Sequence, residues 1–321
     1  MKIRLVLTIF LAVAAAAPAA SQQYPAKPIR FIVPFAPGGS SDIQARVIGQ
    51  KLTEAWGQPV IVENRASGGG IVGAEIAAHA VPDGHTLFLG HVGTQAANPS
   101  LYARLPYDPA RDFIPVIQTI TQPLVLVVPP TSKMDTVSDL IASARREPGK
   151  LLYASAGNGS PNHIAGEMFR AMAKLDLVHV PYKGSAPAEI DLMAGRVTVF
   201  FDTMLSAMPF IRDGRLRALA VTSSQRSATL PRVPTVAESS LPQYELMTWN
   251  GFFVPAGTPQ PIVAKLNGEI ARILSLADTR RRLATDGAEI AAGSPEAFAS
   301  YVRRERDKLA AVIRSAGIRI E

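Results

Sequence analysis

A short apolar segment followed by a glycine-rich turn is the feature that most limits how this chain can fold. Residues 29–33, reading IRFIV, are typical of a buried strand, and residues 34–42, reading PFAPGGSSD, lead into a helical pattern. Gly38 and Gly39 let the backbone approach a ligand closely, and the hydroxyls of Ser40 and Ser41 stand beside N–H groups that a helix start leaves unpaired. This arrangement predicts a socket for an anion at the end of the strand.

Strand-like and helix-like patterns alternate along the rest of the chain. We expect strands at 60–63, 86–89, 124–128, 151–154, 177–180, 198–201 and 251–254. We expect helices at 42–56 with a stop at Gly57, at 71–80, from 136 to before 148, from 161, at 186–194, and as three closing helices, the last opening at 294–295. Because strands that alternate with helices form parallel βαβ units, this order predicts an α/β fold with ligand-binding loops at the carboxyl ends of the strands.

The length of the chain and its second set of strands together predict two domains. About 300 residues after a leader exceed one ordinary core and suit two domains of ~150 residues. We expect the chain to cross between them near 121–124 and again near 222–240. The first domain would then comprise 24–122 plus 235–321, and the second 123–234.

The first residues have the three parts of a secretory leader. Lys2 and Arg4 precede an apolar run over 5–17, and the small residues around 19–21 suit a signal peptidase, with cleavage expected between Ala19 and Gln22. The apolar run is shorter than the roughly 20 residues that span a bilayer. Because the chain has no cysteine, neither disulfides nor a lipidated cysteine is expected. We therefore predict a signal peptide over 1–21 and a Sec-exported, soluble, non-lipidated protein in the periplasm.

Composition and charge favour a folded protein that captures small anions. Hydrophobic residues make up 47% of the chain and charged residues 18%, which excludes a disordered or coiled-coil chain. Removing Lys2 and Arg4 takes the formal net charge from +7 to +5, and a mild positive field attracts small anions. The basic residues are scattered and form no block interleaved with aromatics, so nucleic acid is not an expected partner. We expect a monomer that uses no cofactor.

The loops that end the strands of both predicted domains are small and polar. The candidate ligand-binding residues of the first domain are Phe35, Ala36, Pro37, Gly38, Gly39, Ser40, Asp42, Ser67, Gly68, His91, Thr94 and Asn98. Those of the second domain are Ser155, Gly157, Ser160, His163, Lys183, Gly184 and Asp202. Two facing α/β domains place such loops along one cleft, where N–H groups, hydroxyls and waters can hold a carboxylate without a buried arginine. For any one loop taken alone, a tight turn after a strand is an equally good interpretation.

Some of these side chains have two interpretations. Asp42 at a helix start is most simply a cap, whereas as a ligand residue it would repel carboxylates and favour an amine. Lys183 lies in a loop that otherwise lacks charge, so it could meet a second carboxylate, although exposed lysines are common. His91 and His163 lie in strand-to-helix loops and could face the cleft, and His179 within a strand is most simply structural. The histidines form no cluster with metal-ligand spacing, so a metal site is not expected.

Two enzyme classes match parts of the sequence poorly. Residues 68–73 fit G-x-G-x-x-G, but the strand after them ends in Gly90-His91, where a dinucleotide site needs an acidic residue. A secreted hydrolase is the stronger rival, yet no serine lies in G-x-S-x-G. Ser160 is only three residues from His163, a spacing more natural for capping or ligand contact than for a catalytic pair. The sequence therefore favours a binding protein over an enzyme.

A series of motifs spans the chain from residue 24 to residue 321. They read YPAKPI at 24–29, IVPFAPGG at 32–39, VENR at 62–65, PDGHTL at 82–87, NPSLY at 98–102, YASAG at 153–157, HVPYKG at 179–184 and PTVAE at 234–238. In this order and spacing they resemble the Bug family of periplasmic solute receptors, the extracytoplasmic component of tripartite tricarboxylate transporters.

The resemblance implies a two-domain periplasmic-binding-protein fold of type II, the Venus flytrap, with a helix-flanked sheet in each domain and one small carboxylated solute in the cleft. In this family backbone N–H groups and bridging waters of the first-domain loops hold the carboxylate, and the matching residues here are 36–40 and 67–68. One departure is Ala66-Ser67, where relatives often have Pro-Gly, and this would alter the water positions. The resemblance also implies membrane permease subunits as partners, with a sensing receptor for a signalling partner as the alternative. Because family members differ widely in ligand, the identity of the solute stays open.

Overall fold

The computed structural model describes residues 24–318 and residue 320, so the predicted signal peptide over 1–21 lies outside the described residues. Its strands are β1 (Ile29–Val33), β2 (Val60–Asn64), β3 (Thr86–His91), β4 (Phe113–Val128), β5 (Leu152–Ser155), β6 (Val178–Pro181), β7 (Val199–Thr203), β8 (Arg217–Val221), β9 (Met247–Pro255) and β10 (Glu289–Ile290). Its α-helices are α1 (Ser40–Trp56), α2 (Ile71–Ala78), α3 (Asn98–Leu101), α4 (Val137–Arg146), α5 (Pro161–Ala173), α6 (Ser185–Met193), α7 (Met204–Arg212), α8 (Val236–Ser239), α9 (Gln260–Ser275), α10 (Ala277–Ala284) and α11 (Pro295–Ser315). Two short helical turns, η1 (Gly68–Gly70) and η2 (Gly93–Ala97), precede α2 and α3. Among the described helices, none is both long and apolar enough to cross a membrane.

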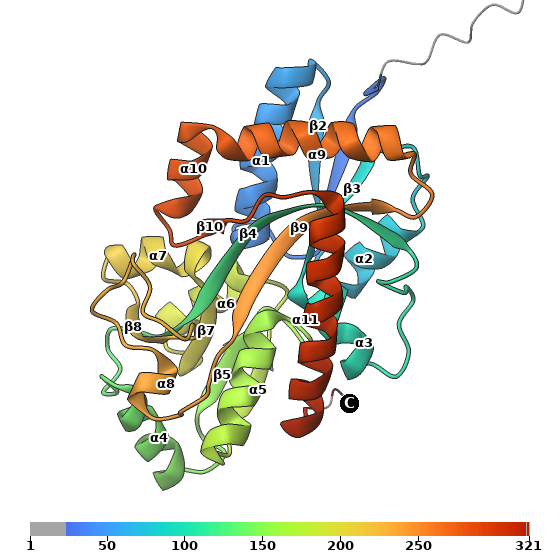
Figure 1. The fold of residues 1–321 in the computed structure, drawn as a ribbon. Helices are drawn as coiled ribbons and strands as arrows, with labels where there is room; N and C mark the ends of the chain where they lie inside the picture. The colour runs from blue at the N-terminus through green and yellow to red at the C-terminus, as the bar shows by residue number, and fades with distance from the viewer. Residues whose placement is uncertain (1–23, 319, 321) are drawn as a thin grey trace, which may run out of the picture.

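One long strand joins two halves of the sheet. The strand order is β2-β1-β3-β9-β4-β7-β5-β6, with β8 and β10 also paired to β4. Residues 113–123 of β4 pair with β9, whereas residues 124–127 pair with β7. We call residues 24–123 with 247–318 the first lobe and residues 124–246 the second lobe. Figure 1 shows β4 running diagonally from one lobe into the other.

Parallel pairing occurs where the alternation of strands and helices predicts it. β1 pairs in parallel with β2 and β3, and β5 does so with β6 and β7. β9 runs antiparallel to both β3 and β4, because it brings the chain back from the second lobe, and the sheet is therefore mixed. The prediction missed the first part of β4, all of β8 and helix α7, whose patterns are interrupted by polar residues or proline.

The chain crosses between the lobes twice, once inside the range expected from the sequence and once after it. The first lies within β4 between Pro123 and Leu124, inside the expected range 121–124. After β8 the chain stays with the second lobe, where the Tyr244 hydroxyl donates to the Ala165 carbonyl at 2.8 Å. The return to the first lobe comes at Met247, the first residue of β9, so the boundary expected at 235 falls inside the second lobe.

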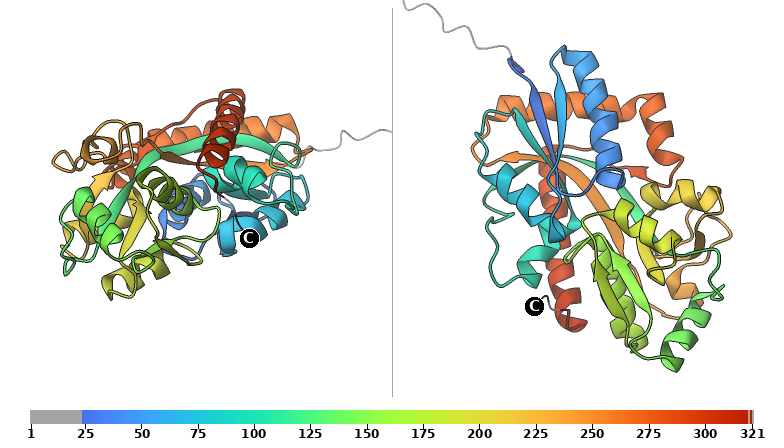
Figure 2. Two further views of the ribbon diagram at one scale, coloured as in Figure 1. Left: turned by 90° about the horizontal axis from the view of Figure 1, so that it is seen from below. Right: turned by 180° about the vertical axis from the view of Figure 1, so that it is seen from behind.

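Helices cover both faces of the first-lobe sheet (Figures 1 and 2). They bury alternate side chains of its strands. In β1, Phe31 packs with α1 and α9, whereas the next residue, Ile32, packs on the opposite face with α2 and α11. Because successive strand residues point to opposite faces, a strand covered on both sides must be apolar throughout. This explains the unbroken apolar run of residues 29–33. Helix α1 ends as predicted, with Gly57 in a left-handed conformation at φ 67°.

An ion pair between β1 and β2 makes the unfolding free energy depend on pH. Arg30 Nε donates to Glu63 Oε1 at 2.7 Å, and Arg65 donates to the other oxygen at 2.8 Å. The hydrogen bond from Arg30, opposed by burial and supported by Arg65, lowers the pKa of Glu63 from 4.5 to about 2. A carboxyl with a lowered pKa stabilises the fold above its ordinary pKa and loses this contribution as the pH falls toward 2. We therefore expect Glu63→Gln to lose less unfolding free energy than the unmodified protein between about pH 5 and pH 3. Urea denaturation at each pH measures this difference, and equal acid sensitivity of the two proteins would contradict it.

Candidate functional site

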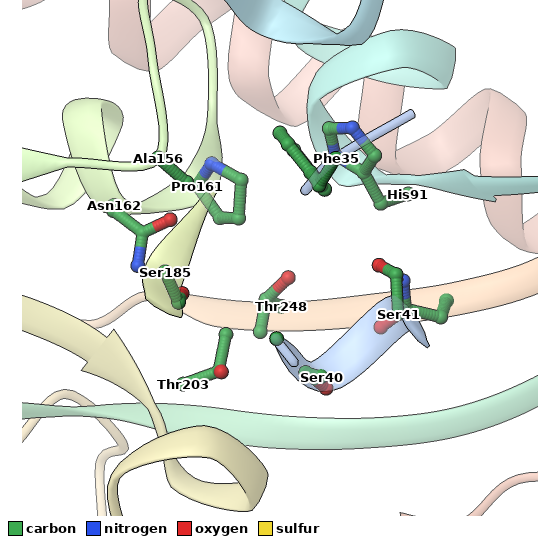
Figure 3. A pocket seen from close by; sticks show the side chains of 12 residues that line it. Phe35, Ser40, Ser41, His91, Ala156, Pro161, Asn162, Ser185, Thr203 and Thr248 are labelled. Atoms are coloured by element: carbon green, nitrogen blue, oxygen red, sulfur yellow. The ribbon is translucent and has the colours of Figure 1, made fainter. Parts of the chain in front are cut away.

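A pocket lies between the two lobes (Figure 3). The first lobe contributes Phe35, Gly39, Ser40, Ser41, His91, Thr248 and Asn250 to its walls. The second lobe contributes Ala156, Pro161, Asn162, Ser185 and Thr203. No lysine or arginine is among these lining residues. Phe35, Gly39, Ser40 and His91 are the sequence candidates that the structure brings together in the pocket wall.

The two lobes touch each other beside the pocket. The Ala36 N–H donates to the Lys183 carbonyl across the gap at 2.8 Å, and the Tyr102 hydroxyl donates to the Asn158 carbonyl at 3.0 Å. A Cβ atom placed on Gly69 of the first lobe would overlap the Asn158 carbonyl oxygen of the second. The structure therefore holds the lobes in a closed arrangement.

Helix α1 begins at the first-lobe wall of the pocket. Its N-cap residue, Gly39, has no side chain to bond the free N–H groups of the first turn. Within residues 24–318, the N–H groups of Ser40 and Ser41 have no hydrogen-bond acceptor. Free N–H groups and the helix dipole both favour an anion at such a terminus. Figure 3 shows Ser40 and Ser41 at the start of this helix, on the pocket side.

Asp42 holds the turn in shape and does not line the pocket. Its carboxylate accepts hydrogen bonds from the Gly38 N–H at 3.0 Å, from Arg46 Nε at 2.9 Å and from Asn64 Nδ2 at 3.0 Å. Burial raises the pKa of Asp42, but the bonds from Arg46, Gly38 and Asn64 together hold it below the usual value. Asp42 is thus ionised, neutralised by Arg46, and bonded to an N–H group before the helix, in keeping with its interpretation as a cap.

The hydroxyls of Ser40 and Ser41 already accept hydrogen bonds from neighbouring amides. Gln122 Nε2 donates to Ser40 Oγ at 2.8 Å, and Asn250 Nδ2 donates to Ser41 Oγ at 3.1 Å. The orientation of the Gln122 amide follows from its neighbours, because its Oε1 accepts the Leu205 N–H at 2.9 Å. A hydroxyl that accepts keeps its own proton for donation. Both serines can therefore donate to a ligand in the pocket.

His91 adds a further donor to the first-lobe wall. The Gly93 N–H donates to His91 Nδ1 at 3.0 Å, so the proton of the neutral ring lies on Nε2. Burial lowers the pKa of His91 to about 3, which keeps the ring neutral. The ring packs on Phe35 with 4.7 Å between centroids, and its Nε2 has no partner among the described residues. His91 Nε2–H is thus an unpaired buried donor.

The second-lobe wall is organised around Asp202. Ser185 Oγ donates to Asp202 Oδ1 at 2.7 Å, and the Thr203 N–H donates to the same oxygen at 2.8 Å. Ser185 is the first residue of α6 and Thr203 is the N-cap of α7, so one carboxylate serves both helix starts. Asn162, at the start of α5, donates through Nδ2 to the Phe201 carbonyl at 2.6 Å. Figure 3 shows the Asn162 oxygen on the side of the pocket.

Most of the other sequence candidates shape the loops around the pocket. Thr94 Oγ1 bonds the His91 backbone, Asn98 Nδ2 donates to the Gly69 carbonyl, Ser67 Oγ accepts the Val72 N–H, and Gly184 packs on Ala36. Lys183 is exposed and meets the first lobe through its carbonyl. Pro37, Gly68 and Gly157 lie in the same loops without lining the pocket.

The two contacts between a serine and a histidine stabilise loops and a helix start. Ser160 is the N-cap of α5 and accepts the His163 N–H at 3.2 Å, which confirms the interpretation of this pair as a cap. Ser155 Oγ lies 2.6 Å from His179 Nε2 and accepts the Gly157 N–H. Burial, followed by the charge of His163, lowers the pKa of His179 to about 3, which makes it a poor base. Neither pair lines the pocket. Among the described residues, no group of three or more metal-binding side chains is placed to hold an ion.

Several lining residues are absent from the candidate ligand-binding residues. Ser41 was expected only as a hydroxyl beside the anion socket, and Asn162 and Ser185 lie inside or beside loops that the sequence marks as small and polar, so their helix-start positions were the available signal. Thr248 and Asn250 belong to β9, the returning strand. No local motif marks β9 as part of the site, because only the antiparallel pairing with β4 brings it to the pocket.

Residues 44–318 match the family described as tripartite tricarboxylate transporter family receptor. A UPF0065 protein from the tcbD-tcbE intergenic region of Pseudomonas sp. strain P51 is 43% identical over 286 residues, covering 89% of this chain and 85% of that protein. Protein BugT of Bordetella pertussis is 37% identical over 318 residues, covering 98% of each chain.

Solved structures share the fold over about nine-tenths of this chain. R. palustris Rpa4515 with adipate is 36% identical with a TM-score of 0.89, covering 92% of this chain and 100% of that one. The periplasmic binding protein BugD is 32% identical with a TM-score of 0.89 and the same coverage. MatC from Rhodopseudomonas palustris with bound malate is 35% identical with a TM-score of 0.87, covering 90% of this chain and 100% of that one.

Proposed function

This chain belongs to the tripartite tricarboxylate transporter receptor family, and on that premise we propose that its pocket captures one small carboxylated metabolite. The resemblance to the Bug family and the expected two-domain fold of periplasmic binding proteins are both confirmed. The family and its structural neighbours are periplasmic solute-binding receptors, not enzymes. Two of these neighbours were solved with a dicarboxylate, adipate in one and malate in the other.

The single observation that carries the proposal is the uncapped start of α1 inside a pocket without cationic side chains. The N–H groups of Ser40 and Ser41, with the proton of each hydroxyl, form a set of donors at one wall. A carboxylate has two oxygens with several lone pairs, so it can accept from all of these donors together. Charge-assisted bonds from N–H groups at a helix start are short and strong. The solute is therefore held by dipoles and hydroxyls, without a salt bridge.

Capture would close the two lobes over the solute. A ligand bound between α1 and the second-lobe wall gains contacts in the closed arrangement that an open one lacks, and this difference shifts the equilibrium toward closure. The hinge would lie where the chain crosses the lobes, at Pro123-Leu124 in β4 and just before Met247 in β9. The candidate loops at Ala36 and Lys183 would then meet only after closure, since their hydrogen bond joins the lobes.

The proposal includes export and delivery. Removal of a signal peptide over 1–21 would release the protein into the periplasm, where the closed form docks on permease subunits of a tripartite tricarboxylate transporter. A role as a sensing receptor for a signalling partner is the alternative, and it uses the same pocket.

A thermal-shift screen of purified, ligand-stripped protein tests the proposal. We expect at least one small carboxylate to raise the melting temperature, since a ligand at 100 times its dissociation constant adds ~2.7 kcal/mol to the unfolding free energy. The methyl ester of the same acid is the matched control and should have no effect, because it lacks the charge that α1 attracts. Stabilisation by none of the di-, tri-, amino or aromatic acids, together with turnover of an ester substrate, would favour the hydrolase instead.

A further inference from the structure

We infer that one wall of the pocket offers hydrogen-bond donors and the opposite wall offers acceptors, an arrangement that we call its polarity. The solute then points a carboxylate at α1 and a donor group, a hydroxyl or an ammonium, at Ser185 and Asn162. This inference rests on the proposed function and narrows it. It makes Asp202, which does not line the pocket, a positioning residue that acts through Ser185.

The first-lobe wall offers donors. Ser40 and Ser41 each accept a hydrogen bond from an amide of their own lobe, so each has a proton to give. Their N–H groups lack acceptors within residues 24–318. An acceptor with two oxygens satisfies this wall, and a donor group would leave its protons unpaired.

The second-lobe wall offers acceptors. The proton of the Ser185 hydroxyl is used in the 2.7 Å bond to Asp202, so only the lone pairs of Ser185 Oγ remain for a ligand. The Asn162 amide is turned the same way, since its Nδ2 is used in the 2.6 Å bond to the Phe201 carbonyl and its oxygen remains. The side chains of both residues are nearly fully buried, so water cannot easily replace the missing donors.

Two buried carboxyl groups lie behind this wall. Asp202 is fully buried and lies next to Glu189, whose Oε1 accepts the Ser206 hydroxyl at 2.6 Å. Burial, followed by the Asp202 carboxyl, raises the pKa of Glu189, and burial also raises the pKa of Asp202. Two donors, Ser185 Oγ and the Thr203 N–H, bond Asp202 Oδ1. None of the described lysine or arginine side chains forms an ion pair with either carboxyl.

The buried acids of the two lobes, Asp42 and Asp202, therefore have different partners. Asp42 beneath α1 is neutralised by Arg46, which leaves the helix dipole free to attract an anion. Asp202 has no such partner, and its Oδ1 already accepts from the first residue of α6 and from the N-cap residue of α7. A carboxylate at Ser185 would meet two acceptors, the oxygens of Ser185 and Asn162, whereas a hydroxyl or ammonium would be bonded.

Matched ligand series test this polarity by titration calorimetry. The probes are succinate with 4-hydroxybutanoate and 4-aminobutanoate, glutarate with 5-hydroxypentanoate and 5-aminopentanoate, and the corresponding three- and six-carbon sets. At the chain length that fits, we expect the hydroxy or amino acid to bind at least about tenfold more tightly than the dicarboxylate.

Two variants and one control separate polarity from simple packing. Ser185→Ala removes the acceptor, so the preference for the hydroxy or amino acid should fall about tenfold, while the dicarboxylate is little affected. Asp202→Ala releases the Ser185 proton toward the pocket, so the dicarboxylate should gain affinity. Ser206→Ala is the matched control: it removes a buried serine hydroxyl from the same acid pair on the side of Glu189 and should leave the preference unchanged. Circular dichroism and melting curves establish that each variant is folded. If Asp202→Ala does not fold, Ser185→Ala alone tests the polarity.

The outcomes separate this inference from the proposed function. A dicarboxylate that binds as tightly as its hydroxy and amino partners, or an unchanged preference in Ser185→Ala, overturns the polarity while carboxylate capture stands. Binding of no acid in any series overturns both. A preference that Ser185→Ala abolishes and Ser206→Ala preserves supports the assignment of the two walls.

Discussion

Replacing Gly69 by alanine is expected to weaken solute binding by about 100-fold or more, equivalent to ~2.7 kcal/mol, without unfolding the protein. An alanine Cβ at this position would overlap the Asn158 carbonyl oxygen, which belongs to the opposite lobe, and would lie 3.1 Å from the Tyr102 hydroxyl. The overlap exists only when the lobes are closed, so the variant would have to stay partly open. Titration with a carboxylate that stabilises the unmodified protein measures the loss, and small-angle scattering should show less ligand-induced compaction.

The matched control for this variant is Gly57→Ala. Gly57 has φ 67° and Gly69 has φ 62°, so alanine costs each position roughly the same 1–2 kcal/mol of backbone strain. No atom lies within 4 Å of a Cβ on Gly57, which ends α1 far from the opposite lobe. We therefore expect a similar loss of unfolding free energy in both variants and a loss of affinity in Gly69→Ala alone. Equal affinities in the two variants would show that binding does not need the observed closure.

The alternation of strands and helices was sufficient to predict the α/β architecture, because each lobe builds its parallel pairs from consecutive segments. β1 and α1 are clear in the sequence, since a strand covered on both faces is continuously apolar and Gly57 ends the helix. Only the last five of the sixteen residues of β4 were predicted as strand, because its first part mixes polar residues and prolines with apolar ones while it pairs with β9. The second boundary came too early in the prediction, since residues 222–246 have no pattern that tells which lobe they pack on. Long-range pairing, not local preference, decides both features.

The first-lobe wall of the site was largely predictable, and the second-lobe wall was not. A glycine turn that opens a helix has a local signature, so Gly39 and Ser40 could be named from the sequence. The role of Asp202 depends on Ser185, seventeen residues away in the chain, and on Glu189, and neither contact has a sequence signature. The same limit applies to Ser40, because its donor role depends on Gln122 in the middle of β4. Residue types can indicate that a loop binds an anion. Whether each hydroxyl donates or accepts can be assigned only from the side chains that surround it in the structure.

Replacing Asp42 by alanine is expected to cost about 2–3 kcal/mol of unfolding free energy and to weaken solute binding at least tenfold. Its buried carboxylate joins the Gly38 N–H, Arg46 and Asn64, and removing it leaves the N–H group of the turn without an acceptor. The N–H groups of the first helical turn would then no longer be held in the positions that receive a carboxylate. Urea denaturation and ligand titration on the same preparation measure the two effects.

Arg46→Ala separates the shape of the turn from its charge. The Arg46 side chain is 56% exposed whereas that of Asp42 is 6% exposed, so removing the arginine leaves a carboxylate that keeps its bonds to Gly38 and Asn64. Half-exposed ion pairs contribute about 0–1 kcal/mol, and we expect a stability loss within this range. Binding should weaken less than in Asp42→Ala, because the turn is intact but the Asp42 charge is no longer neutralised beneath α1. If the arginine variant lost as much stability and affinity as the aspartate variant, charge compensation rather than the geometry of the turn would govern the anion site.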